Sequence, residues 1–155
     1  MGATQGKLQQ LMMDSAVQTS VKMTAQMLGM SEETVTKILQ VGLPMVARMA
    51  DENPELLKTM FAQSVKLMPE SIQSFYSNVA SDPEAQQRLV DEFKSMAGPM
   101  TESLNREAAS ASGISEPQAE RAMATSFPGV AQALGKENTE QTETGFRQRL
   151  KDLVA

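Results

Sequence analysis

Helix start and stop signals divide this sequence into short segments. These signals limit the possible folds more strongly than any other feature of the sequence. Within the segments, apolar residues recur every three or four positions, which is the spacing of one face of an α-helix. Gly29, Gly98 and Gly113 stand where such segments end, whereas Ser31 and Asn53 stand where others begin. We find no convincing strand pattern and no Asn-Gly or Asp-Gly hairpin turn. The sequence therefore predicts an all-α, multihelical single domain of about eight to ten short helices.

Two prolines interrupt apolar segments that otherwise continue a helical pattern. Proline removes one helical hydrogen bond, and its fixed φ angle suits the first turn of a new helix. We therefore expect Pro44 and Pro128 to open short separate helices at 44–50 and 128–134.

Two stretches of the chain, residues 22–50 and 106–134, resemble each other. Aligned without gaps, they share seven identical residues in 29 positions. The matched residues include those with special backbone roles: Gly29 with Gly113, Ser31 with Ser115, and Pro44 with Pro128. This similarity predicts an internal duplication, with a helical insertion at 51–105 and a polar linker and C-terminal helix at 135–155.

Each repeat also has the spacing of a helix-turn-helix unit. In such a unit, a small residue lies four positions before the turn glycine, and apolar residues follow the turn. The first copy supplies Ala25, Gly29, Val35 and Ile38, and the second supplies Ala109, Gly113, Ala119 and Ala122. We therefore predict two helix-turn-helix-like units.

The charge of these units disfavours DNA as a partner. The helix after the first turn carries Glu32, Glu33 and Lys37, and its counterpart carries Glu116, Glu120 and Arg121. Each helix has more acids than bases, so phosphate would be repelled where a recognition helix has to approach it. Nucleic-acid binding is therefore an alternative and not the main interpretation.

At these residues the chain resembles the YidB-like bacterial proteins, a family of uncharacterised small helical proteins. The shared element is Gly-hydrophobic-Ser-Glu followed by an apolar segment with an internal proline. It occurs as Gly29-Met30-Ser31-Glu32 with Leu43-Pro44-Met45-Val46, and again as Gly113-Ile114-Ser115-Glu116 with Phe127-Pro128-Gly129-Val130. The resemblance implies an all-α fold of helix-turn-helix-like units, and it transfers no activity and no catalytic residue.

The composition excludes several chemistries. The chain contains no cysteine and no histidine, so the usual zinc, copper and haem ligands and the Ser-His-Asp and Cys-His catalytic groups are absent. The neighbouring acids Glu32-Glu33, Asp51-Glu52 and Asp91-Glu92 do not converge, because adjacent helical residues point about 100° apart. We assign no catalytic, cofactor-binding or metal-ligating residue and expect a protein that is not an enzyme and takes no cofactor.

Methionine is unusually frequent, with 13 residues in 155. Its flexible thioether suits adaptable binding surfaces as well as irregular cores. The net charge is −5, and no apolar run reaches the length of a membrane span. We therefore expect a methionine-rich cytoplasmic protein without a membrane span.

Together these features favour a non-enzymatic interaction or structural protein of unknown role. We expect it to bind a protein partner or a second copy of itself through an exposed Met/Leu face, using the helix expected at 6–28 or the one expected at 145–154. Two alternatives stay open. One is a helix-turn-helix nucleic-acid binder, and the other is a carrier of an apolar ligand in a Met-lined groove.

Overall fold

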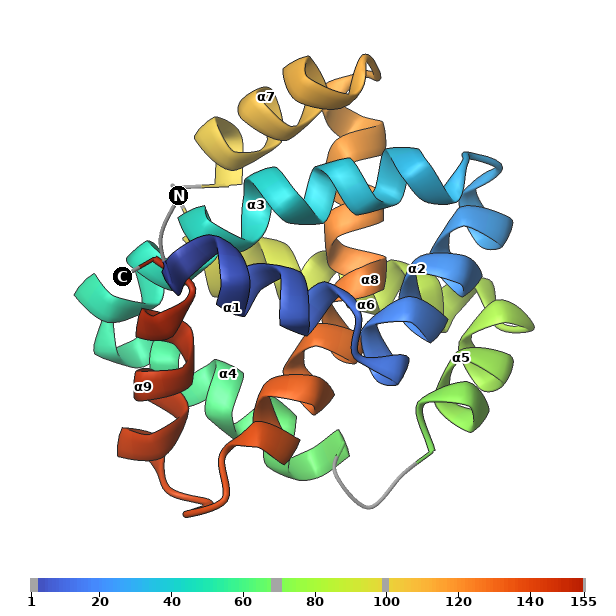
Figure 1. Ribbon diagram of the computed structural model, residues 1–155. Coiled ribbons are helices and arrows are strands. Elements are labelled where there is room, and N and C mark those ends of the chain that lie inside the picture. Colours follow the sequence, from blue (N-terminus) through green and yellow to red (C-terminus); the bar gives the residue numbers. More distant parts are fainter. Residues whose placement is uncertain (1–2, 68–70, 99–100, 155) are drawn as a thin grey trace.

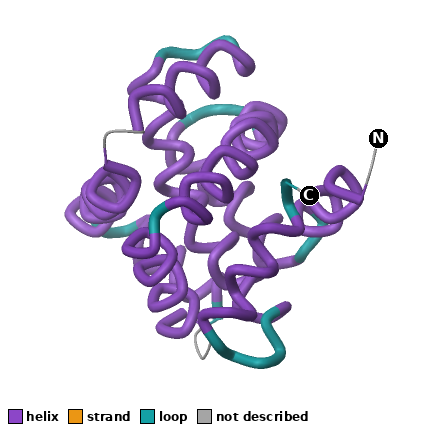
Figure 2. Tube along the Cα trace, turned by 90° about the vertical axis from the view of Figure 1, so that its left-hand side faces the viewer, coloured by secondary structure: helices purple, strands orange, loops and turns teal. Residues whose placement is uncertain are grey.

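The computed structural model describes residues 3–67, 71–98 and 101–154, and their regular structure is helical, as predicted. Short connections join the helices (Figure 1, Figure 2). The nine helices of this part of the chain are α1 (Ala3–Met12), α2 (Ser15–Leu28), α3 (Glu32–Glu52), α4 (Pro54–Leu67), α5 (Ile72–Ala80), α6 (Pro83–Ala97), α7 (Thr101–Ser112), α8 (Glu116–Glu137) and α9 (Glu143–Asp152).

Helix α8 forms the centre of the molecule. It runs through the middle of the bundle, and α2, α4, α6 and α7 pack directly against it (Figure 1). Every residue from 122 to 135 is buried. A helix that is buried on all sides needs neighbours on all sides, and the small side chains of Ala122, Ser126 and Gly129 let those neighbours approach closely.

The two helix-turn-helix-like units pack across one another. Helix α2 contacts α8 more extensively than it contacts α3, and α7 contacts α3 more extensively than it contacts α8. The two turns have the same geometry, because Gly29 and Gly113 adopt left-handed φ angles of 67° and 73°. Ser31 and Ser115 then cap the following helices by accepting hydrogen bonds from backbone N–H groups. Each unit therefore buries its apolar face on the other.

Side chains cap other helices as well, and Asn53 does so where the sequence predicts a helix start. Asp82 accepts a hydrogen bond from the backbone N–H of Glu84 at 3.0 Å and caps α6. Asn53 accepts from the backbone N–H of Glu55 at 3.1 Å at the start of α4. These caps satisfy N–H groups that have no partner within the first turn of a helix.

The separate helices expected at 44–50 and 128–134 are wrong. Pro44 lies inside α3 and Pro128 lies inside α8, and both helices continue through the proline. Proline costs a helix one hydrogen bond, but both helices bury apolar side chains before and after the proline, such as Leu43 and Val46 in α3 and Phe127 and Val130 in α8. Burial of apolar side chains on both sides of the proline outweighs that loss, so tertiary packing overrides the local signal.

The helix bounds near both ends of the chain also differ from those expected from the sequence. The helix expected at 6–28 breaks at Met13 and Asp14, because the Asp14 carboxylate accepts from the backbone N–H of Ala16 at 2.8 Å and starts α2. The polar stretch is shorter than expected, since α8 continues to Glu137 and α9 begins at Glu143.

Tyr76 binds the backbone of α8 close to Pro128. The Tyr76 side chain comes from α5 and is fully buried. Its hydroxyl donates a hydrogen bond to the Thr125 carbonyl and lies beside the Gly129 backbone and the Ser20 hydroxyl. Because a helical N–H donates to the carbonyl four residues earlier, Pro128 leaves the Ala124 carbonyl without its helical donor, and the Tyr76 hydroxyl binds the next carbonyl along the chain. Burial raises the pKa of Tyr76 well above its ordinary value of 10.0, because the phenolate would lose its hydration.

We predict that alkaline pH destabilises the fold through Tyr76. Its folded-state pKa is raised, so its contribution to stability is complete below the unfolded pKa of 10.0 and is lost as pH rises above that value. The free energy of unfolding should therefore fall above pH 10 by up to about 1.4 kcal/mol per pH unit in the wild type. Tyr76→Phe should lack this component and should be less stable at neutral pH by about 1–2 kcal/mol. Urea denaturation across pH measures both effects. Tyrosinate absorbance, which reports on the single tyrosine of the chain, would contradict the prediction if it appeared before unfolding.

We also predict that Gly129 cannot be replaced. A Cβ atom at this position would lie 2.4 Å from the Ser20 Cβ and 2.7 Å from the Ala16 backbone oxygen. Since a backbone atom cannot move aside easily, Gly129→Ala should cost at least about 1–3 kcal/mol. The matched control is Gly6→Ala in α1, where a Cβ meets nothing within 4 Å and the change should stabilise by about 0.5–1 kcal/mol. Thermal denaturation compares the two variants, and equal stabilities would contradict the close α2–α8 contact.

Candidate functional site

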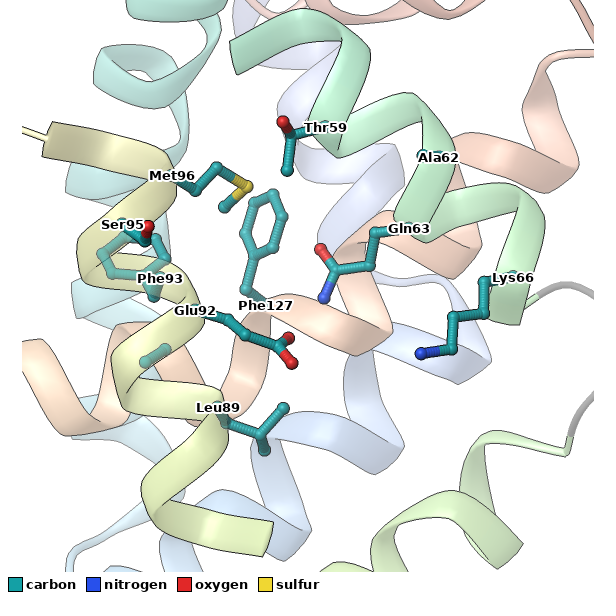
Figure 3. A pocket seen from close by; sticks show the side chains of 11 residues that line it. Thr59, Ala62, Gln63, Lys66, Leu89, Glu92, Phe93, Ser95, Met96 and Phe127 are labelled. Carbon is teal, nitrogen blue, oxygen red and sulfur yellow. The ribbon is translucent and has the colours of Figure 1, made fainter. Parts of the chain in front are cut away.

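A groove opens between α4 and α6 above the centre of α8, and we call it the α4–α6 groove (Figure 3). Its volume is about 360 Å³, within the range of small-molecule sites. Three helices far apart in the sequence form it. The lining residues are Thr59, Ala62, Gln63 and Lys66 from α4, Leu89, Glu92, Phe93, Ser95 and Met96 from α6, and Ala124 and Phe127 from α8.

The floor of the groove is apolar and aromatic. Phe93 and Phe127 are buried, and their ring centroids lie 6.1 Å apart with the planes tilted by 56°. Leu89, Phe93 and Met96 line it from one face of α6, because they are four and three residues apart. Phe127 extends from α8 toward Met96 and Thr59 (Figure 3). An apolar molecule placed here would contact rings, a thioether and aliphatic carbon.

The opening of the groove is polar and carries both signs of charge. Lys66 on α4 and Glu92 on α6 extend toward each other, and the Gln63 amide lies between them and Phe127 (Figure 3). No ion pair joins Lys66 to Glu92, and neither side chain pairs with another residue in the described ranges. The groove therefore combines an apolar floor with an acid, a base and an amide at its opening.

Gln63 is the unusual member of this set. Its side-chain oxygen, Oε1, is buried and accepts no hydrogen bond from the described part of the chain. Buried polar atoms of folded proteins are nearly always hydrogen-bonded. Asn105 and Asn138 also have a buried oxygen without a partner, but their amide nitrogens donate to Glu120 and Thr142. Gln63 has no such second anchor in the described chain.

The acidic pairs noted in the sequence do not come together. Glu33 pairs with Lys37 at 3.4 Å and Asp51 with Arg147 at 3.0 Å, both on exposed surfaces. Of the acids in these pairs, only Glu92 lines the groove. Burial and the nearby Asp14 carboxylate raise the pKa of Glu137, but this residue does not line the groove. Within the described ranges, no three acidic side chains gather in a way that could hold a metal ion.

The helix-turn-helix template describes packing in this protein. In α8, the counterpart of a recognition helix carries Glu116, Glu120 and Arg121, with a net negative charge, and its remaining part is buried from 122 to 135. In α3, the exposed side chains Glu32, Glu33 and Lys37 carry a net negative charge. Buried or acidic helices are poorly suited to the major groove, so this geometry disfavours the nucleic-acid alternative.

Most described methionines belong to the core. Met49, Met60 and Met123 are buried, six others are partly buried against the core, and Met13 is exposed. Met68 and Met100 lie outside the described residues, as does Met1. The α4–α6 groove has Met96 as its one methionine among the described lining residues, so it differs from the Met-lined groove expected from the sequence.

Comparison of the chain with known protein families, curated proteins and solved structures gives no match. None of the helices described here is long and apolar enough to cross a membrane.

Proposed function

We propose that this is a non-enzymatic binding protein that holds a small, largely apolar molecule in the α4–α6 groove. The observation that carries the proposal is the buried Gln63 oxygen, which accepts no hydrogen bond from the described chain inside an apolar groove of about 360 Å³. A buried acceptor without a donor costs about 1–3 kcal/mol. A bound molecule with one N–H or O–H group would remove that cost while covering the rings of Phe93 and Phe127.

This proposal develops the apolar-ligand alternative and changes its expected lining from methionine to phenylalanine. Self-association is less well supported by the surface. In the described residues, the exposed large apolar side chains are Met13, in the α1–α2 turn, and Val65, on α4. Single exposed apolar residues are common on monomeric proteins and do not by themselves indicate an interface.

We predict that filling the groove abolishes binding. N-phenyl-1-naphthylamine, a neutral dye with one N–H group, should bind to the native protein at one site and gain fluorescence. Ala62→Phe places a ring in the groove opening and should weaken this binding at least tenfold, because the ring occupies space needed by the ligand. The matched control is Ala111→Phe, which adds the same ring to another exposed helical alanine, on α7 and outside the groove lining. Equal dye affinities in both variants would contradict the proposed site.

We further predict opposite effects of Gln63→Met on stability and binding. Methionine fills a similar volume but has no buried amide oxygen, so the variant should be more stable by about 1 kcal/mol. It should bind the dye several-fold more weakly, because the ligand N–H loses its acceptor. Urea denaturation and dye titration measure the two effects. A variant that is less stable would show that Gln63 supports the fold and does not serve a ligand.

A further inference from the structure

We infer that the ligand of the α4–α6 groove is a small zwitterion with an apolar body, such as a free apolar amino acid. This inference rests on the proposed binding function and specifies the ligand class. It follows from the arrangement of one base, one acid and one amide above an aromatic floor.

The two charges at the groove opening have opposite signs and come from different helices. Lys66 extends from α4 and Glu92 from α6, and the charged ends face each other across the opening (Figure 3). Six bases of the described chain, among them Lys37, Lys94 and Arg147, form ion pairs with acids. Lys66 and Glu92 have no such partner there. A ligand with adjacent carboxylate and ammonium groups would pair with both.

Gln63 can serve both ends of such a ligand. Its amide offers two N–H donors and one carbonyl acceptor. In Figure 3 the nitrogen lies on the Glu92 side of the amide and the oxygen on the Phe127 side. The nitrogen can donate to a ligand carboxylate, and the buried oxygen can accept from a ligand ammonium. Charge-assisted hydrogen bonds of this kind are about twice as strong as neutral ones.

The floor selects the rest of the ligand. Phe93, Phe127 and Met96 provide aromatic and thioether contacts, which favour an aromatic or branched aliphatic side chain. A fatty acid would fit the floor, but its single carboxylate would leave Glu92 unpaired and facing a like charge. Charge complementarity at the opening therefore favours the zwitterion.

Calorimetric titration with four derivatives of L-phenylalanine tests this inference. The free amino acid carries both a positive and a negative charge, and its amide carries only the positive charge. Its N-acetyl form carries only the negative charge, and its N-acetyl amide is uncharged. The free amino acid should bind at least tenfold more tightly than the uncharged form, with the singly charged forms between them. The same four derivatives of L-leucine are titrated in parallel.

Charge-removing variants assign each ligand group to its partner. Glu92→Gln should weaken binding of the free amino acid severalfold and should not weaken the N-acetyl form, whose carboxylate no longer faces a like charge. Lys66→Met should weaken the free amino acid and should not weaken the amide, for the same reason. The matched controls are Glu84→Gln on α6 and Lys58→Met on α4, two exposed residues outside the groove lining that should change neither titration.

The outcomes separate this inference from the function on which it rests. If the uncharged form binds as tightly as the free amino acid, or if dodecanoate or the N-acetyl form binds most tightly, the zwitterion is wrong and the groove still binds apolar molecules. If no derivative binds, but the dye binds and Ala62→Phe blocks dye binding, the zwitterion is again wrong and the groove still binds apolar molecules. If neither the dye nor any derivative binds, the proposed function fails as well.

Discussion

The buried helix α8 is the constraint on which the rest of the structure depends. A helix with a continuous run of buried residues from 122 to 135 can exist only when other helices cover every side. It also contains Pro128, which breaks its hydrogen-bond ladder in the middle of the core. The Tyr76 hydroxyl donates to the Thr125 carbonyl, next to the Ala124 carbonyl that Pro128 leaves without its helical donor. The centre of the fold thus combines a proline inside a buried helix with a buried tyrosine that binds the helix backbone beside it.

The α4–α6 groove follows from this arrangement. Helices α4 and α6 both rest on α8, and the aromatic side chain of Phe127 lies between them (Figure 3). Close packing of the bundle leaves few sites where polar atoms meet an apolar surface, and Gln63 stands at one of them. An acceptor that costs the fold stability is expected at a functional site more than elsewhere. This local cost at Gln63 is the reason for proposing a binding function.

Sequence reasoning succeeded where the signal was local. The caps at Ser31, Asn53 and Ser115 and the turn at Gly29 depend on a few neighbouring atoms, and the structure confirms them. The prediction from sequence was wrong at Pro128. There the local rule that proline ends a helix is outweighed by the packing of buried residues on both sides of the proline. The groove was not predictable because its residues come from three segments, each of which resembles an ordinary amphipathic helix. The one available signal was Gln63, a polar residue next to the apolar face of α4.

Hydrogen bonds within a few residues decide the helical class, most helix starts and the two left-handed glycine turns, so these features are predictable from the sequence alone. The continuity of α3 and α8 through their prolines instead depends on tertiary packing, since the energy that holds these helices together comes from distant neighbours. The tertiary structure also decided that Gln63, Lys66 and Glu92 share one opening, because the packing of α4 and α6 on α8 sets that distance and no sequence spacing encodes it.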